Sequence, residues 1–228
     1  MLNVKWQRIS LRVNIIVSPF LIDWNGIAPR FFEMIHDALS DDIAVNPGDF
    51  SVSVSNNLAD VVARYDIFGA TSNVSLHSDR LTMEFPTLVP EDEQLVLRIL
   101  EKVVTAFPQA FPGHRYSRVH ASLFRHGAVP KDVAVAEYLA RHGNSVTDRA
   151  FGEMEAVYQP AVRFSVRATA GTWRATCTLE QSEILPNGLF MDLDVIFPSV
   201  DESAGFQDWV KSFLVVADGC MGALELER

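Results

Sequence analysis

The sequence predicts an α+β fold in which two consecutive β-α-β(3–4)-α units form one antiparallel sheet with helices packed on one face. Three observations carry this prediction. Residues 8–18 alternate between polar and apolar side chains, which is typical of a strand with one buried face. Two segments, 27–40 and 90–107, repeat apolar residues at helical spacing. The same order of strand and helix patterns then recurs after residue 112.

The first half of the chain contains a helix between strands and a second helix after them. The pair Asn25-Gly26 precedes the helix predicted over residues 27–40. Residues 50–88 are rich in β-branched and aromatic types, and Asn-Asn, Gly and Ser-Asp breaks divide them into three or four strands. The helix over 90–107 opens with Pro90 and three acids, a favourable first turn, and the segment FPGH ends it.

The second half follows the same order. A strand pattern covers 114–129, and the segment 130–143 predicts a helix with proline at its start and glycine at its end. Three further strand patterns and a final helix complete the chain. They span residues 156–170, 171–185, 187–198 and 201–219.

Short sequence matches between the halves indicate an internal duplication. They pair Arg12-Val13 with Arg118-Val119, Arg64-Tyr65 with Arg163-Phe164, Met83-Glu84 with Met191-Asp192, and the helical pattern 96–104 with 206–214. The boundary falls near Phe111-Pro112-Gly113, where the sequence has no flexible linker. We therefore predict halves 1–111 and 112–228 that are related by a pseudo-twofold axis and share one core.

The composition is that of a globular protein and argues against several classes of function. The chain has 228 residues, 48% hydrophobic and 21% charged, and its net charge of −10 argues against double-stranded DNA as a partner. No glycine-rich phosphate or dinucleotide loop and no G-x-S-x-G elbow occurs, so we expect no cofactor. The N-terminal apolar stretch is too short and too polar for a signal or a membrane span, so we expect a cytoplasmic location. The two cysteines, Cys177 and Cys220, predict buried free thiols.

Two resemblances extend the fold prediction. The tandem order β-α-β-β-β-β-α is similar to the duplicated fold of the TATA-box-binding proteins, in topology and without their sequence motifs. The segments RLTMEF, SRVHASLFRHG and MDLDVIF resemble a sporadically distributed family of bacterial proteins that carries RIGLRYIN-type and LDIDLY-type strands. The glycine and asparagine of the first family pattern are replaced in this chain. This resemblance implies a bacterial protein of the predicted fold and implies no activity.

The polar face of the predicted strands collects most of the arginines, whereas the acids crowd the helices and loops. Arginine binds anionic groups through paired hydrogen bonds. We therefore interpret the chain as a non-enzymatic binding protein whose open sheet face holds an anionic ligand or an acidic partner. Cross-strand pairs of arginine with aspartate on a solvated sheet face are the alternative. The candidate surface consists of Arg12, Arg64, Arg118, His120, Arg163, Arg167 and Arg174.

Two other functions stay open on the sequence. Asp192 and Asp194 stand two apart in the strand LFMDLDVIFP, so their carboxylates point to one face about 7 Å apart. With Glu180 as a third acid they could hold Mg²⁺ in a metal-dependent phosphotransfer enzyme. The acidic helices could instead bind a basic partner, as in an immunity or antitoxin-like protein.

Overall fold

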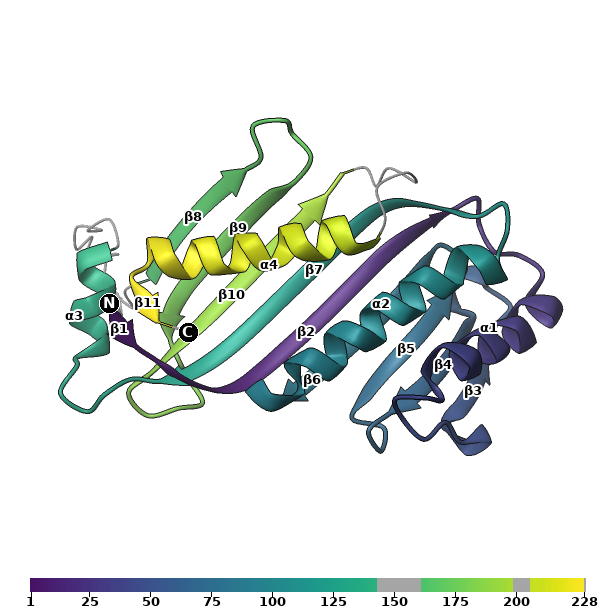
Figure 1. Cartoon of the computed structure of the whole chain (residues 1–228), viewed down its shortest axis with the longest axis horizontal. Helices are drawn as coiled ribbons and strands as arrows, with labels where there is room; N and C mark the ends of the chain where they lie inside the picture. Colours follow the sequence, from purple (N-terminus) through teal and green to yellow (C-terminus); the bar gives the residue numbers. More distant parts are fainter. Residues whose placement is uncertain (143–160, 199–205, 228) are drawn as a thin grey trace, which may run out of the picture.

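The computed structural model describes residues 1–142, 161–198 and 206–227 and has an α+β architecture. Its main sheet has nine strands in the order β3-β4-β5-β6-β2-β7-β10-β9-β8, and every neighbouring pair is antiparallel. The two longest strands, β2 (Lys5–Ser18) and β7 (Arg115–Ala128), lie side by side at its centre (Figure 1). All other strands of this sheet therefore extend outward from this central pair.

The two sides of the sheet come from the two halves of the chain. One side holds β3 (Phe50–Ser53), β4 (Val62–Ile67), β5 (Ser72–His77) and β6 (Arg80–Leu88). The other holds β10 (Gly188–Phe197), β9 (Arg174–Gln181) and β8 (Ala161–Arg167). The helices are α1 (Trp24–Leu39), α2 (Glu93–Ala110), α3 (Val135–His142) and α4 (Phe206–Ala223). Two short strands, β1 (Leu2–Asn3) and β11 (Leu226–Glu227), pair in parallel away from the main sheet.

The core lies between the sheet and helices α1, α2 and α4, which cross one face of it (Figure 1). Alternate residues of each strand point into this layer, as Val13 and Ile15 of β2 do. On the side of α1, the ring of Phe50 stacks on Tyr65 with 4.7 Å between centroids. No helix within the described ranges crosses the opposite face, which we call the open face.

The sequence predictions of element order are confirmed, and helix boundaries in all four helices are corrected. α2 spans Glu93–Ala110 and not 90–107, and α4 ends at Ala223 and not at residue 219. α1 begins at Trp24, so Asn25-Gly26 lie inside its first turn, because the backbone carbonyl of Asp23 already accepts from Ile27 N–H at 2.9 Å. α3 begins at Val135 and not at Pro130. Val135 is the first of its apolar residues that pack against the core at helical spacing. The strand pattern before residue 161 and the helix start at 201–205 lie outside the described residues.

The register between strands tests the sequence matches that suggested a duplication. Val13 of β2 is paired with Met83, whereas Val119 of β7 is paired with Phe197. If Val119 takes the place of Val13, the counterpart of Met83 is Phe197 and not Met191. The Arg-Val match and the Met-acid match therefore do not hold together as structural equivalences. The strand order is arranged alike on both sides of the β2–β7 pair, and the duplication itself stays a prediction.

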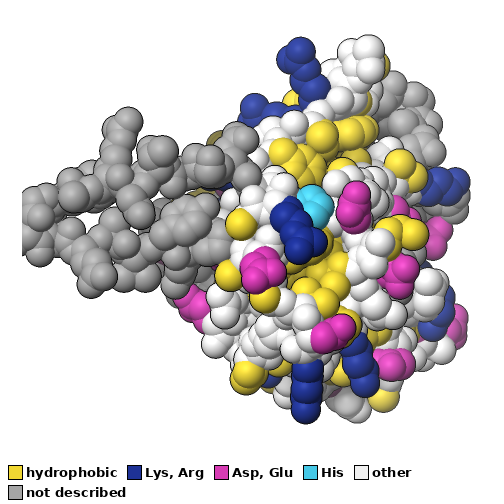
Figure 2. Space-filling view, turned by 90° about the vertical axis from the view of Figure 1, so that its left-hand side faces the viewer, with side chains coloured by type: hydrophobic (Ala, Val, Ile, Leu, Met, Phe, Trp, Pro, Cys, Tyr) yellow, Lys and Arg dark blue, Asp and Glu magenta, His cyan; other side chains and the backbone are white. Residues whose placement is uncertain are grey.

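One end of the molecule brings together α3, β1 and β11. The hydroxyl of Tyr138 donates a hydrogen bond to the Leu224 carbonyl, and His142 Nε2 lies 3.8 Å from Glu225 Oε2. Figure 2 views this end and shows acidic and basic side chains interspersed around small groups of hydrophobic ones. No helix in the described part of the chain is long and apolar enough to cross a membrane.

The two cysteines are buried free thiols, as the sequence predicts. Cys177 of β9 and Cys220 of α4 form a hydrogen bond with each other, and this bond together with burial raises the pKa of Cys177 well above its usual range. Because the thiolate is the reactive form, Cys177 is a structural thiol that joins α4 to the sheet.

Gly127 of β7 allows a close approach of the N-terminal strand segment. A Cβ at this position would lie 2.3 Å from Val4 Cγ1 and 2.8 Å from Trp6 Cε3. We expect Gly127→Ala to lower the free energy of unfolding by roughly 1–3 kcal/mol, because the added methyl displaces a packed indole. Gly48→Ala is the matched control, since a Cβ there meets nothing within 4 Å. Urea denaturation checks both variants, and equal effects would contradict this packing argument.

Candidate functional site

All seven candidate binding residues predicted from the sequence lie on the open face. In most of the strands they alternate with residues buried beneath the helices, as Arg64 does with Tyr65 and Arg12 with Val13, whereas Val166 beside Arg167 is exposed. The open face is accessible to solvent, since the side chain of Arg12 is 56% exposed and that of His120 is 41% exposed. The sequence pattern therefore identified the face, and the register decides which of its residues meet.

Two rows of side chains cross the open face from strand to strand. The first row holds Asp66, Asn73, Glu84, Arg12, Ser122, Asp194, Thr176 and Ser165 in directly opposite positions. The second row holds Arg64, Ser75, Thr82, Asn14, His120, Ile196, Arg174 and Arg167. Every member of the first row is polar, whereas Ile196 interrupts the second.

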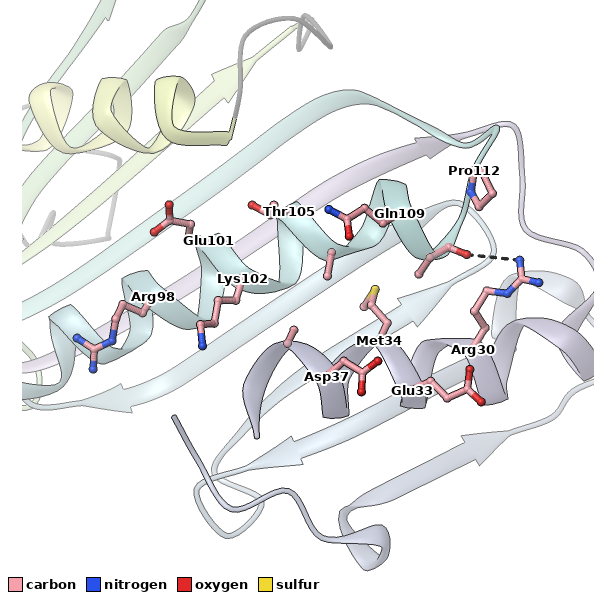
Figure 3. Close-up of a pocket in the computed structure, with 13 residues that line it drawn as sticks. Arg30, Glu33, Met34, Asp37, Arg98, Glu101, Lys102, Thr105, Gln109 and Pro112 are labelled. Carbon is pink, nitrogen blue, oxygen red and sulfur yellow. Dashed lines mark hydrogen bonds between the residues drawn. The ribbon is translucent and has the colours of Figure 1, made fainter. Parts of the chain in front are cut away.

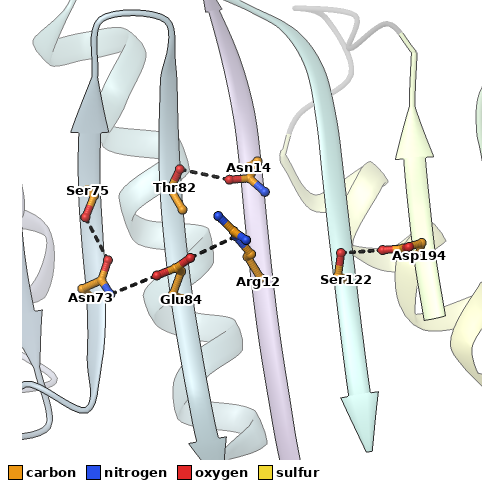
Figure 4. A network of polar contacts seen from close by, with 8 residues as sticks. All are labelled: Arg12, Asn14, Asn73, Ser75, Thr82, Glu84, Ser122 and Asp194. Atoms are coloured by element: carbon orange, nitrogen blue, oxygen red, sulfur yellow. Dashed lines mark hydrogen bonds and ion pairs between the residues drawn. The ribbon is translucent and has the colours of Figure 1, made fainter. Parts of the chain in front are cut away.

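On the side of β4, β5 and β6 the two rows satisfy their own charges. Arg12 Nε lies 3.0 Å from Glu84 Oε1, and Arg64 Nε lies 2.6 Å from Asp66 Oδ1. Asn73 donates to Glu84 at 3.4 Å, which extends the contacts across three strands (Figure 4). Arg12 and Arg64, two of the seven candidates, are thus paired with carboxylates. The Arg12–Glu84 pair crosses from β2 to β6, as in the alternative interpretation, but with a glutamate, whereas Arg64 pairs with Asp66 of its own strand.

On the other side of the sheet, Asp194 is the carboxylate that binds neighbouring polar side chains of the open face. The hydroxyl of Ser122 donates to its Oδ1 at 2.5 Å (Figure 4). His120 Nε2 lies 3.1 Å from the same oxygen. Ser122 is only 7% exposed, so this hydrogen bond satisfies a buried hydroxyl. Sequence reasoning overlooked Ser122, although it shares the alternation of Arg118 and His120 along β7.

A pocket of about 620 Å³ lies on the open face over β8, β9 and β10. We call it the sheet pocket. Its charged and polar lining consists of His120, Arg163, Ser165, Arg167, Arg174, Thr176, Thr178, Asp192 and Asp194. Four of the seven candidates therefore come together here with both aspartates. Arg118 lies outside this lining, at the end of the face.

The three arginines of the sheet pocket differ from those elsewhere on the face. Within the described ranges, Arg163, Arg167 and Arg174 make no hydrogen bond or ion pair. Arg174 stands between Ile196 on β10 and Arg167 on β8, so neither cross-strand neighbour offers an acceptor. Two like charges directly opposite each other in a sheet are destabilising. The pocket thus holds three guanidinium groups that form no ion pair in the described structure, although Arg163 acts on Asp192 at longer range.

Asp192 is an acid of the sheet pocket that likewise lacks a hydrogen-bond partner within the described residues. It stands between Phe124 on β7 and Thr178 on β9, and its buried Oδ1 accepts no hydrogen bond from the described residues. Burial raises the pKa of Asp192, the nearby carboxylates of Asp194 and Glu180 raise it further, and Arg163 partly opposes them. The carboxyl group is therefore held in surroundings that disfavour its charged form.

The three acids proposed for a metal site share the open face. Glu180 is opposite Phe190 on β10 and does not line the sheet pocket. Among the described residues, no group of three histidine, cysteine or acidic side chains is arranged to hold a metal ion. The cross-strand arginines expected to neutralise Asp192 and Asp194 do not reach them either, since Asp194 binds Ser122 and His120 instead.

A larger hollow than the sheet pocket lies between α1 and α2 and has a volume of about 930 Å³ (Figure 3). Its basic side chains are already engaged. Lys102 Nζ lies 2.7 Å from Asp42 Oδ2 and Arg98 Nε lies 3.6 Å from Asp42 Oδ1, while Arg30 donates to the carbonyl of Ala110 at 3.4 Å. The hydrogen bond from Lys102 lowers the pKa of Asp42 and outweighs the opposing effect of burial. The basic side chains of this groove therefore already have acceptors within the protein, unlike the three arginines of the sheet pocket.

The comparisons with known proteins leave the function to be argued from geometry. No family model matches the chain, and no curated protein matches it at a significant level. The resemblances to the TATA-box-binding proteins and to the sporadically distributed bacterial family stay predictions from the sequence.

Asp192 makes stability depend on pH in a direction opposite to that of a salt-bridged acid. The fold raises the pKa of Asp192 above the ordinary value of 3.8, so the folded state favours the protonated carboxyl group. Protonation of Asp192 therefore adds fully to stability below the unfolded-state pKa, and this contribution is lost as the pH rises through the folded-state pKa. We expect Asp192→Asn to match the wild type near about pH 4 and to be more stable near about pH 7. Urea denaturation across this range measures the difference.

Asp194→Ala provides the contrast, because it removes the acceptor of Ser122 and should cost roughly 1–2 kcal/mol at neutral pH. A stability gap between Asp192→Asn and the wild type that stays constant with pH would contradict the assignment.

Proposed function

We propose that this chain is a binding protein that holds the anionic group of a small ligand in the sheet pocket. One observation carries the proposal. Arg167 and Arg174 stand directly opposite each other across β8 and β9, and neither has a carboxylate partner in the described structure. Arg163, two positions from Ser165 on the same face of β8, supplies a third guanidinium to the same hollow.

The physical argument rests on the cost of leaving these charges unneutralised. Cβ atoms of directly opposite residues lie about 5 Å apart, so the two guanidinium groups repel each other unless an anion lies between them. A phosphate or carboxylate can accept paired hydrogen bonds from each guanidinium and so replaces repulsion with attraction. Thr176 and Thr178 add hydroxyl donors from β9. The pocket therefore offers more donors to an anion than the protein itself uses.

The size of the pocket favours a small ligand over a macromolecule. A volume of about 620 Å³ falls in the range of about 300–1,000 Å³ that is typical of small-molecule sites. The arginines on the other side of the sheet are occupied by Glu84 and Asp66, so the positive charge does not continue as a track along the face. This supports a local site and not a groove for a nucleic acid strand. The buried thiols of Cys177 and Cys220 are in keeping with a reducing, cytoplasmic setting.

Inorganic phosphate is the probe that tests this proposal. We expect it to bind the wild type and to raise the melting temperature, since a ligand that binds only the folded chain stabilises it by mass action. Arg167→Gln and Arg174→Gln should each weaken phosphate binding about tenfold or more, in line with the loss of a charge-assisted hydrogen bond. Without phosphate, the same variants should be at least as stable as the wild type, because the cross-strand repulsion is gone.

Arg12→Gln is the matched control, because this arginine lies on the same face and is already paired with Glu84. It should bind phosphate as the wild type does at equal ionic strength. If Arg12→Gln loses as much affinity as Arg174→Gln, or if phosphate does not bind the wild type, the proposed function is wrong.

A further inference from the structure

The sheet pocket contains acids as well as arginines, and no ion pair joins the two sets in the described structure. Thr178 of β9 separates Asp192 from Arg163, since it is paired with both. Two strand spacings therefore lie between them, roughly 10 Å from Cα to Cα. Asp194 is one strand away from Arg174 but is displaced along it by two residues, and it already accepts from Ser122 and His120. The three arginines and the two aspartates thus line opposite sides of the sheet pocket, and the space between them stays open.

Resting on the proposed function, we propose that the ligand of the sheet pocket is a small zwitterion. Its anionic group is bound by Arg163, Arg167 and Arg174, and its ammonium group is bound by Asp192 with Asp194 beside it. The chemical class is an amine that carries a phosphate or comparable anionic group a few bonds away.

The state of Asp192 favours an ammonium group as the second point of contact. Its Oδ1 is buried and accepts no hydrogen bond from the described part of the chain, so a donor from the ligand would satisfy it. Phe124 flanks it on one side and removes competing water. The carboxylate of Asp194 lies two residues along the same face of β10, and a positive group between the two acids relieves their repulsion. A hydroxyl group would donate a hydrogen bond but would leave this repulsion in place.

The same acids disfavour a ligand that is anionic along its whole length. A second phosphate placed against Asp192 or Asp194 would meet like charge in a partly buried site, and such contacts cost affinity. The arginines therefore attract the anionic end of the ligand, and the aspartates exclude an extended polyanion. The pocket selects for charge separation within one small molecule.

Calorimetric titration of the intact chain with phosphoethanolamine, ethyl phosphate and ethanolamine tests this inference. The first two probes carry the same anionic group, and only the first adds an ammonium group. We expect phosphoethanolamine to bind about tenfold or more tightly than ethyl phosphate, and ethanolamine to bind most weakly. Asp192→Asn should remove this preference, because it abolishes the affinity gained from the amine while ethyl phosphate binds as well as before or better.

Asp66→Asn is the matched control, since this acid lies on the same face, is paired with Arg64, and stands far from β10. It should keep the full preference for phosphoethanolamine. Equal binding of both phosphate esters by the wild type, with the arginine dependence intact, would overturn the zwitterion and leave the anion site standing. Failure of both esters to bind would overturn the proposed function and this inference together.

Discussion

The antiparallel pairing of β2 with β7 is the interaction on which the rest of the structure depends. Both strands span fourteen residues, and their register runs from Lys5 opposite Ala128 to Ser18 opposite Arg115. It joins the two halves of the chain into one sheet, and every outer strand adds to one of its edges. A slip of one residue would turn the apolar side of either strand away from the helices. The burial of Val13, Ile15 and Val119 therefore fixes the register, and the register fixes every neighbour on the open face.

That register divides the open face into a self-neutralised side and an unsatisfied side. In the first row, a polar partner follows every polar residue, so Arg12 finds Glu84 and Asp194 finds Ser122. In the second row, Ile196 is the cross-strand neighbour of Arg174 on β10, and Arg167 is its cross-strand neighbour on β8. Natural sheets use opposite charges at such positions, and a directly opposed arginine pair departs from that rule. Departures of this kind are expected where a protein gives up some stability for binding.

The sequence alone was sufficient for the fold and for the identity of the open face. Alternation along residues 8–18 and helical spacing over 90–107 are local patterns, so they can be recognised without knowing any partner. The pairing of Arg12 with Glu84 and the isolation of Arg174 depend instead on which strands are neighbours and on their register. These are long-range properties that no local pattern encodes. The alternative of cross-strand arginine–aspartate pairs does not extend to Asp192 for the same reason. Phe124 and Thr178 flank it in the folded sheet, and Arg163 acts on it only from two strands away.

The charge of the whole chain and that of the sheet pocket act over different distances. The net charge of −10 repels polyanions at long range, but salt screens this field beyond about 8–10 Å. In the sheet pocket, three exposed guanidinium groups and two half-buried carboxylates line one hollow, so a ligand bound there lies well within a screening length of both. The net charge of the protein would not repel a small zwitterion with little net charge. Such a molecule could contact both the arginines and the aspartates of the sheet pocket. Burial and the neighbouring carboxylates raise the pKa of Asp192, and an ammonium group beside it would oppose this shift by favouring the carboxylate.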